Sequence, residues 1–136
     1  MAEDTLTYKG AVYPWQMDHM DHMNVMFIVG KFDEATWNFF AGFGMDVAYF
    51  KDNRAGMAAV QQNIAYRKEV LPGAVVEVRT RIVELRDKVL TYVHAMTDGA
   101  GDLIAECEMT TVHMDTIERR ACPFPDPIRA ALTEAL

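Results

Sequence analysis

Cysteine is scarce in this chain of 136 residues, which has only Cys107 and Cys122. Two cysteines cannot build a disulfide framework, and no C-x-x-C pair is present to hold zinc. No stretch approaches the roughly 18 uninterrupted apolar residues of a membrane-spanning helix, and the N-terminus, MAEDTLTYKG, has no basic region followed by an apolar one. We therefore expect a cytoplasmic protein with reduced thiols and no membrane contact.

Basic residues are also few, with 13 Lys and Arg against 20 Asp and Glu and a net charge of -7. This balance provides no general attraction for nucleic acid, so we expect no nucleic-acid partner. The basic side chains between positions 67 and 120 nevertheless leave room for a local anion site. They are Arg67, Lys68, Arg79, Arg81, Arg86, Lys88, Arg119 and Arg120.

Hydrophobic residues make up 51% of the chain and charged residues 24%, which is typical of a folded protein. The length fits one domain, residues 1–136, with a proline-rich tail and a short terminal helix from about residue 121. We find no internal repeat. A functional site must therefore lie on a single core or between identical chains.

Apolar residues recur at helical spacing between residues 24 and 41 and predict a long, largely buried helix. Asp21 or Asn24 can cap its start, and Gly42 with Gly44 can end it. A strand is predicted before it, over 6–15. A short helix is predicted after it, over 46–52, followed by a loop over 53–56.

Alternating patterns from Met57 onward predict strands, most clearly over 74–85, 88–97 and 103–114, and a last helix starts at Asp126. Runs of strands beside one buried helix favour an α+β fold over a doubly wound parallel sheet. We expect an antiparallel sheet of about five strands wrapped on one long central helix.

The segment before the long helix, WQMDHMDHMN, holds two aspartates, two histidines and an asparagine at residues 15–24. The first N–H groups of a helix are unpaired donors with positive partial charge, so they can hold the oxygen of a polarised carbonyl. A carboxylate beside such donors is the minimum set of groups for acyl transfer.

The arrangement D-x-x-x-H-x-N, followed by F-x-E-A on the helix, resembles the hotdog-fold acyl-CoA thioesterases of the 4-hydroxybenzoyl-CoA thioesterase type. It reads Asp18-His19-Met20-Asp21-His22-Met23-Asn24 and then Phe32-Asp33-Glu34-Ala35. The strand order and the segment YRKEVLPG at 66–73 agree with the resemblance. Asp21 stands where the family usually has a glycine, and Gln16 where it often has an acidic residue.

This resemblance implies hydrolysis of an acyl-CoA thioester to a free acid and CoA on a hotdog fold without a cofactor. Asp18 matches the catalytic aspartate, which either attacks the carbonyl or activates a water, and His22 and Asn24 match the pair that shapes the loop. Backbone N–H groups at Asn24, Val25 and Met26 would form the oxyanion hole. The family also implies a homo-oligomer, dimer or tetramer, with sites at the dimer interface.

Substrate contacts are expected from two groups of residues. Basic side chains, with Arg67 and Lys68 first and Arg86, Lys88, Arg119 and Arg120 as further candidates, could bind the CoA phosphates. Trp15, Phe27 and Trp37, with the local negative charge, suit a small cationic acyl group. The front segment also resembles, more loosely, thioesterases of carnitine breakdown, whose substrate would be betainyl-CoA.

Several alternatives stay open at this stage. Asp18, His19, Asp21 and His22 together resemble metal ligands, but neighbours in sequence rarely all face one ion, so no metal site is predicted. Asp33 and Glu34 could supply a carboxylate from the helix instead. His94, His113 and Cys107 fit satisfied or core positions. A hotdog enoyl-thioester hydratase and a non-catalytic ligand-binding module are the competing functions.

Overall fold

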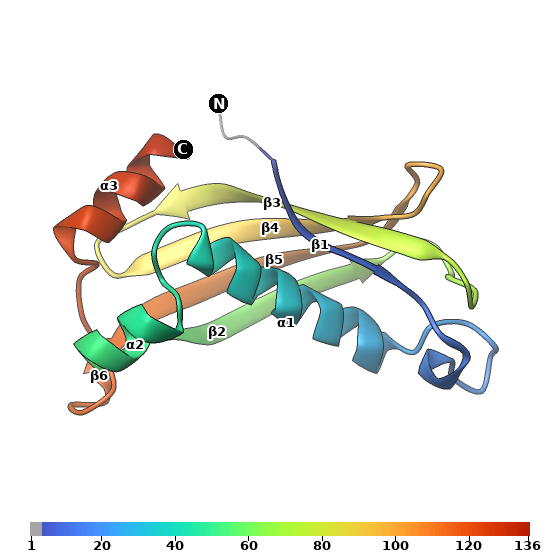
Figure 1. Ribbon diagram of the computed structural model, residues 1–136, viewed down its shortest axis with the longest axis horizontal. Helices are drawn as coiled ribbons and strands as arrows, with labels where there is room; N and C mark the ends of the chain where they lie inside the picture. Colours follow the sequence, from blue (N-terminus) through green and yellow to red (C-terminus); the bar gives the residue numbers. More distant parts are fainter. Residues whose placement is uncertain (1–3) are drawn as a thin grey trace.

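One antiparallel sheet curves around a long helix in the computed structural model, which describes residues 4–136 (Figure 1). The sheet has six strands: β1 (Thr5–Ala11), β2 (Ala55–Tyr66), β3 (Val75–Leu85), β4 (Val89–Thr97), β5 (Leu103–Asp115) and β6 (Arg120–Ala121). Their order is β1-β3-β4-β5-β2, and β6 pairs with β5. The predicted α+β architecture with a central helix is confirmed.

The central helix α1 spans Val25–Ala41, as its periodicity predicts. Asn24 is the N-cap, because its side chain accepts a hydrogen bond from the Met26 N–H, and Gly42 follows the last turn. One face of α1, including Phe32, Ala35 and Phe39, is buried against the sheet. Trp37 on the opposite face is 54% exposed, so this chain alone does not cover the helix on all sides.

The strands follow the alternating pattern closely. On β3, the inward residues Val76, Val78, Thr80 and Ile82 are buried, as predicted. The first strand ends at Ala11 instead of residue 15, because Pro14 begins a 3-10 turn, Pro14–Gln16. The predicted loop over 53–56 is shorter, because Arg54 in the left-handed conformation ends helix α2 (Val47–Asn53) and β2 starts at once.

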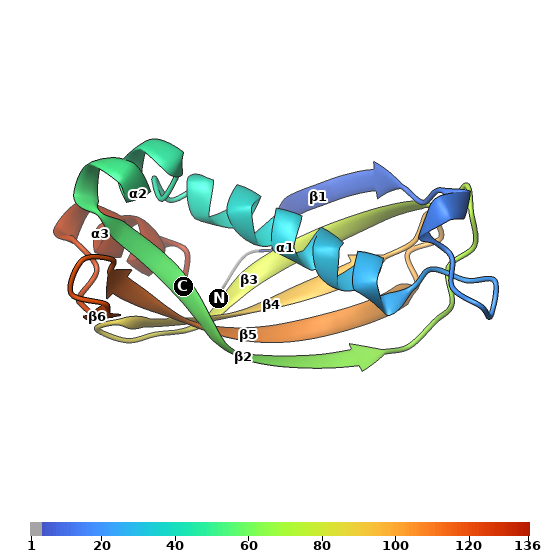
Figure 2. The ribbon, with the colours of Figure 1, turned by 90° about the horizontal axis from the view of Figure 1, so that it is seen from below.

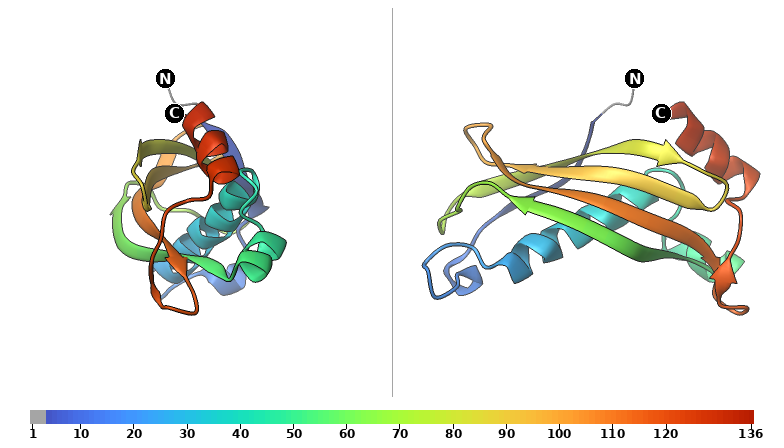
Figure 3. Two further views of the ribbon diagram at one scale, coloured as in Figure 1. Left: turned by 90° about the vertical axis from the view of Figure 1, so that its left-hand side faces the viewer. Right: turned by 180° about the vertical axis from the view of Figure 1, so that it is seen from behind.

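The two ends of the molecule carry different elements. At one end lie α2, β6 and the terminal helix α3 (Asp126–Glu134), and at the other lies the loop that leads into α1 (Figure 2). The views in Figure 3 show the sheet curling around α1 along its length. None of the helices within residues 4–136 has the length and apolar character needed to cross a membrane. The start of α1 is therefore presented at one end of the molecule, beside the β2–β3 connection.

Candidate active site at the start of helix α1

The loop before α1 is closed on itself and tied to the rest of the fold. Met17 and Met23 form an isolated antiparallel bridge, and the Asp18 N–H donates to the His22 carbonyl at 2.9 Å. The Met23 N–H donates to the Val70 carbonyl at 2.8 Å, which links the loop to the segment after β2. Backbone bonds thus fix the position of the side chains at 18–22.

Asp21 takes the position where the resemblance noted in the sequence leads us to expect a glycine. Its φ angle is +63°, in the left-handed region that most residues avoid and that aspartate tolerates better than most. The loop therefore keeps a glycine-like path with an aspartate in place.

The carboxylate of Asp18 has one engaged oxygen and one oxygen nearly free. Oδ1 accepts a hydrogen bond from the Met20 N–H at 2.8 Å, and Oδ2 lies 3.8 Å from His22 Nδ1. The Met20 N–H, helped by the charges of His22 and His19, holds the pKa of Asp18 below its usual value. Asp18 is therefore ionised at neutral pH and can act as a base or nucleophile.

His22 lies between two carboxylates. Its Nδ1 faces Asp18, and its Nε2 is 3.6 Å from Glu69 Oε1. Both distances exceed a hydrogen bond. A water molecule or a substrate atom can therefore bridge His22 and either carboxylate.

The first turn of α1 leaves one backbone donor available. The Met26 N–H donates to Asn24 Oδ1 at 2.9 Å, whereas the Val25 N–H meets no acceptor among residues 4–136. Of the predicted oxyanion donors, Val25 is therefore free, Met26 is engaged by the helix cap, and the Asn24 N–H donates to the Gln16 carbonyl at 2.8 Å.

A pocket of about 260 Å³, here called the helix-start pocket, opens beside this turn. It brings together His22, Val25, Arg67 and Lys68, all predicted from sequence. The remaining lining residues are Met23, Ile28, Tyr66, Glu69 and Val70. Asp18 is not part of the lining and reaches the pocket only through its neighbour His22.

The two predicted phosphate ligands already have acidic partners. Arg67 Nη2 is 2.7 Å from Glu106 Oε1, and Lys68 Nζ is 2.7 Å from a carboxylate oxygen of both Asp98 and Asp102. These hydrogen bonds raise the pKa of Lys68 and lower that of Asp98. Each cation keeps N–H donors that these partners leave unused, so a CoA phosphate would either share the cation with a protein carboxylate or displace that carboxylate.

The other basic candidates lie far from this pocket. Arg86 and Lys88 belong to the β3–β4 turn, Arg119 to the β5–β6 turn and Arg120 to the start of β6, all at the opposite end of the sheet (Figure 1). The fold therefore does not bring them together with the start of α1.

The aromatic candidates are also dispersed. Trp15 is 69% exposed and stacks on Tyr13 with ring centroids 4.4 Å apart, and Phe27 packs against the core. Neither lines the helix-start pocket, and Trp37 lines a different one. The expected cluster of these rings is not formed within one chain.

Two pocket residues, Tyr66 and Glu69, escaped the sequence analysis. Glu69 belongs to the same YRKEV segment as the predicted cations, and its proximity to His22 follows from the Met23–Val70 backbone bond. A contact between segments about 45 residues apart produces no periodic pattern in the sequence. Only the basic residues Arg67 and Lys68 indicated that this segment belongs to the site.

The side chains considered as alternative catalytic groups are either buried in the core or exposed away from the helix-start pocket. Cys107 is buried, and burial raises the pKa of its thiol to about 11. His94 and His113 are buried with hydrogen-bonded rings, whereas Asp33 and Glu34 are exposed on α1. Across residues 4–136, no three His, Cys, Asp or Glu side chains converge as metal ligands would.

The chain is similar in sequence to known proteins. A family model described as the thioesterase-like superfamily matches residues 12–132. A betainyl-CoA thioesterase of Pseudomonas aeruginosa is 29% identical over 99% of this chain and 87% of its own length. An L-carnitine dehydrogenase/betainyl-CoA thioesterase of Agrobacterium fabrum is 30% identical over 85% of this chain and 24% of its own length.

Among solved structures, a Staphylococcus aureus protein determined in complex with CoA superposes with a TM-score of 0.91. It shares 19% identity, and the match covers 97% of this chain and 84% of that one. The similarity confirms the hotdog fold that the sequence predicts.

Proposed function

Because the chain belongs to the thioesterase-like superfamily, we propose that it hydrolyses an acyl-CoA thioester to a free acid and CoA, with Asp18 as the reactive carboxylate. The observation that carries the proposal is the ionised Asp18 in a backbone-fixed loop that leads directly into α1, whose first N–H, at Val25, is free. Thiolate is a good leaving group, so the reaction needs a base or nucleophile and an oxyanion donor more than it needs a strong acid.

Asp18 can serve the reaction by two balanced routes. In one, a carboxylate oxygen attacks the thioester carbon, CoA leaves as thiolate, and water cleaves the resulting anhydride. In the other, the carboxylate takes a proton from water as that water attacks the same carbon, and the C–S bond breaks with CoA leaving as thiolate. Oδ2 is the oxygen available for either step, because Oδ1 is bound by the Met20 N–H.

The oxyanion would lie at the first turn of α1. The Val25 N–H is free, and the positive end of the helix dipole adds to its attraction for a developing negative oxygen. Asn24 holds this turn in place by capping it. Met26 joins as a second donor when a substrate oxygen displaces the Asn24 side chain.

CoA would enter along the segment after β2. The similar Staphylococcus aureus protein was solved with CoA, and in this chain Arg67 and Lys68 line the helix-start pocket. The Arg67–Glu106 pair is exposed, with side chains 55% and 40% accessible, so it stabilises the fold little and can yield to a phosphate.

The acyl group is proposed to be small, with betainyl the favoured identity. Two relatives named as betainyl-CoA thioesterases support this, at 29% and 30% identity. Trp15 and Phe27 would contribute only where a second subunit completes the pocket, because one chain leaves them outside it. We accordingly propose a homodimer, or a tetramer made of two such dimers, with sites at the dimer interface.

A free-thiol release assay over a panel of acyl-CoAs tests the function. The panel includes betainyl-CoA and 3,3-dimethylbutyryl-CoA, in which carbon replaces the ammonium nitrogen. We expect thiol release with betainyl-CoA preferred. Equal catalytic efficiency on these two substrates would mean that the pocket selects the acyl group by its size and not by its charge. Hydration of an enoyl-CoA without thiol release would favour the hydratase, and CoA binding without any turnover would favour the non-catalytic module.

A further inference from the structure

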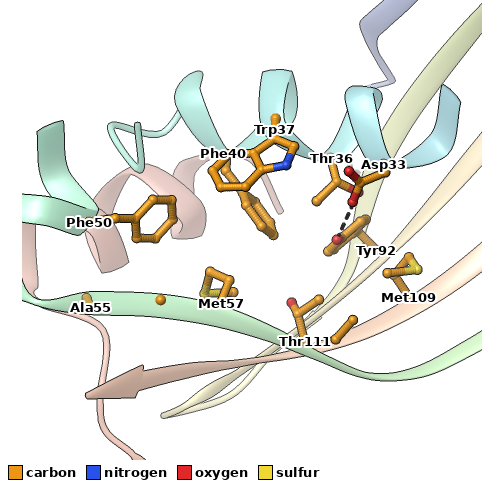
Figure 4. Close-up of a pocket in the computed structure, with 12 residues that line it drawn as sticks. Asp33, Thr36, Trp37, Phe40, Phe50, Ala55, Met57, Tyr92, Met109 and Thr111 are labelled. Carbon is orange, nitrogen blue, oxygen red and sulfur yellow. Dashed lines mark hydrogen bonds between the residues drawn. The ribbon is translucent and has the colours of Figure 1, made fainter. Parts of the chain in front are cut away.

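The edge strand β2 lies uncovered along its free side. Among residues 4–136 it pairs with β5 alone, and residues 59–63 are exposed one after another, although neighbours in a strand face opposite sides of a sheet. A pocket of about 270 Å³ also stays open between β2 and α1, with Trp37, Ala55 and Met57 in its lining (Figure 4). The second subunit of the proposed homodimer would cover both.

The two sides of β2 restrict how two copies of the strand can pair. Gly56 and Ala65 both pair with residues of β5 that face away from α1, Met114 and Glu106. Val60 is the extra residue of a bulge, so the residues on this outer side have even numbers before it and odd numbers after it. Directly opposite residues of an antiparallel pair point to the same side of the sheet. Two copies of β2 must therefore pair even-numbered residues with odd-numbered ones.

Full overlap of the strand with its copy meets this condition. It places Ala65 opposite the partner's Gly56, and Arg67, the residue after β2, opposite the partner's Arg54, the residue before β2. β2 runs from the end of the molecule that carries α2 to the end that carries the start of α1 (Figure 1). The partner's α2 end would therefore lie beside the helix-start pocket, which Arg67 lines.

Arg119 of the β5–β6 turn belongs to the same corner of the molecule as Arg54. It lines a surface groove of about 160 Å³ whose other lining residues include Gly56. The Thr116 N–H and hydroxyl both donate to the Arg54 carbonyl, at 2.9 and 2.8 Å. These bonds fix the turn to the start of β2, so pairing along β2 brings the partner's Arg54 and the partner's Arg119 to the junction together.

Three arginines would meet at this junction. Arg67 is held by Glu106 at 2.7 Å on the outer side of the sheet, and Gly56 places the groove of Arg119 on the same side. Within residues 4–136, neither Arg54 nor Arg119 forms a salt bridge. The partner would thus add two positive charges without a carboxylate beside Arg67, and the junction attracts an anion. Phosphate fits well, because its oxygens accept paired hydrogen bonds from arginine.

We propose that the phosphates of CoA bind across the dimer interface, on Arg67 of one subunit and on Arg54 and Arg119 of the partner subunit. This inference rests on the proposed acyl-CoA substrate and names the residues that hold its phosphates. Val25, where the thioester would lie, and Arg67 line the same helix-start pocket, so one CoA can reach both. The β3–β4 turn, with Arg86, stays on the side of the sheet away from β2 and takes no part.

The register of the two strands can be tested without any ligand. It places Ala58 opposite the partner's Asn63, and directly opposite Cα atoms of an antiparallel pair are about 4.5 to 5.5 Å apart, within disulfide reach. Within one chain the two residues are about 16 Å apart along the strand, so a disulfide between them must join two subunits. We expect Ala58→Cys/Asn63→Cys to form a covalent dimer under mild oxidation and each single variant to remain non-covalent. A double variant without this disulfide would overturn the proposal.

Calorimetric titration with CoA tests the phosphate contacts. Arg54 and Arg119 both have left-handed backbone angles, with φ at +48° and +59°, which asparagine tolerates. Arg54→Asn/Arg119→Asn should therefore stay folded, which thermal unfolding checks, and should bind CoA about ten-fold or more weakly than wild type. Arg86→Asn/Lys88→Asn removes two charges at the same end of the molecule and should bind CoA as wild type does. Equal affinities of these two variants would overturn the proposal.

Heterodimers decide whether the arginines act on their own site or on the partner's. In the first, a wild-type subunit pairs with one that carries Asp18→Asn together with Arg54→Asn and Arg119→Asn. In the second, it pairs with one that carries Asp18→Asn alone. Only the wild-type subunit turns over, so its KM for thiol release reports the partner's arginines. We expect a KM about ten-fold or more higher in the first heterodimer, and equal KM values would overturn the proposal.

A wild-type protein that releases no thiol would contradict the proposed hydrolysis instead. The disulfide and the CoA titration would still decide whether the phosphate site is shared between subunits, since neither measurement needs turnover.

Discussion

Asp18 and His22 have neighbouring positions and different surroundings. Asp18 is held by the Met20 N–H and keeps one oxygen nearly free, whereas His22 lies 3.8 Å from Asp18 and 3.6 Å from Glu69 without a hydrogen bond to either. The carboxylate therefore has the geometry of a reactive group. The imidazole has the geometry of a group that positions water or substrate around it.

His22→Ala and Asn24→Ala should consequently reduce turnover by less than the 10²-fold or more expected for a lost base or nucleophile. Asn24 caps the first turn of α1, and His22 positions water or substrate beside Asp18. Steady-state thiol release for the two variants measures the effect. A loss in either that equals the effect of replacing Asp18 would contradict this assignment of roles.

His94 makes stability depend on pH. Its folded pKa, about 4, lies below the ordinary 6.5, so the unfolded chain binds more protons between these values. Stability falls as pH drops below 6.5, by about 2 kcal/mol at pH 5. Denaturant unfolding at pH 7.5 and pH 5 measures this, and His94→Gln, which cannot titrate, should flatten the dependence.

His113 gives the matched comparison, because burial also lowers its pKa while the Cys122 carbonyl opposes the shift. His113→Gln should flatten the pH dependence less than His94→Gln. If His94→Gln keeps the full wild-type loss of stability between pH 7.5 and pH 5, the buried neutral imidazole is not its source.

At the scale of elements, the loop before α1 carries strain at Asp21. With φ at +63°, a β-branched residue there should cost about 1 to 2 kcal/mol, whereas glycine adopts the angle freely. We predict that Asp21→Val lowers the free energy of unfolding and Asp21→Gly does not. Chemical denaturation of the two variants checks this, and equal stability of Val and Gly would contradict the left-handed conformation.

The elements themselves were predictable because their signals are local. The helical spacing around Phe32, Ala35 and Phe39 and the alternation on β3 set burial directly, so the bounds of α1 and β3 follow from the sequence within about a residue. The bounds of β1 and β2 did not follow from the sequence. The turn at Pro14 ends the extended segment that contains β1, and the left-handed Arg54 sets the start of β2. Both depend on backbone angles that the hydrophobic pattern does not encode.

The site was predictable in part for the same reason. Asp18, His22 and Val25 lie in one short segment, so their proximity is local. The acidic partners of Lys68 come from the β4–β5 hairpin about 30 residues away, and the dispersal of Trp15, Phe27 and Trp37 depends on how the sheet curls. Contacts between such distant segments are determined by the topology of the sheet and produce no periodic pattern in the sequence.

At the scale of the whole molecule, we predict a homodimer or larger assembly. The edge strand β2 pairs on one side only, with β5, and exposes Val60 at 61%, while α1 exposes Trp37 and Met26. Pairing two such edges would cover them. Light scattering at micromolar concentration should give at least twice 15.4 kDa, and Val60→Lys should shift the protein toward the monomer.

A monomer at that concentration would contradict the shared-site arrangement. It would leave the hydrolysis itself intact, because Asp18 and Val25 come from one chain.

The most direct test of the account is single-turnover thiol release by wild type and Asp18→Asn on the best acyl-CoA of the panel. The substitution preserves shape and the Met20 hydrogen bond and removes the charge. We predict that CoA release slows by 10²-fold or more, while substrate binding and the unfolding midpoint stay close to wild type. Wild-type release in Asp18→Asn would contradict the claim that this carboxylate carries the chemistry.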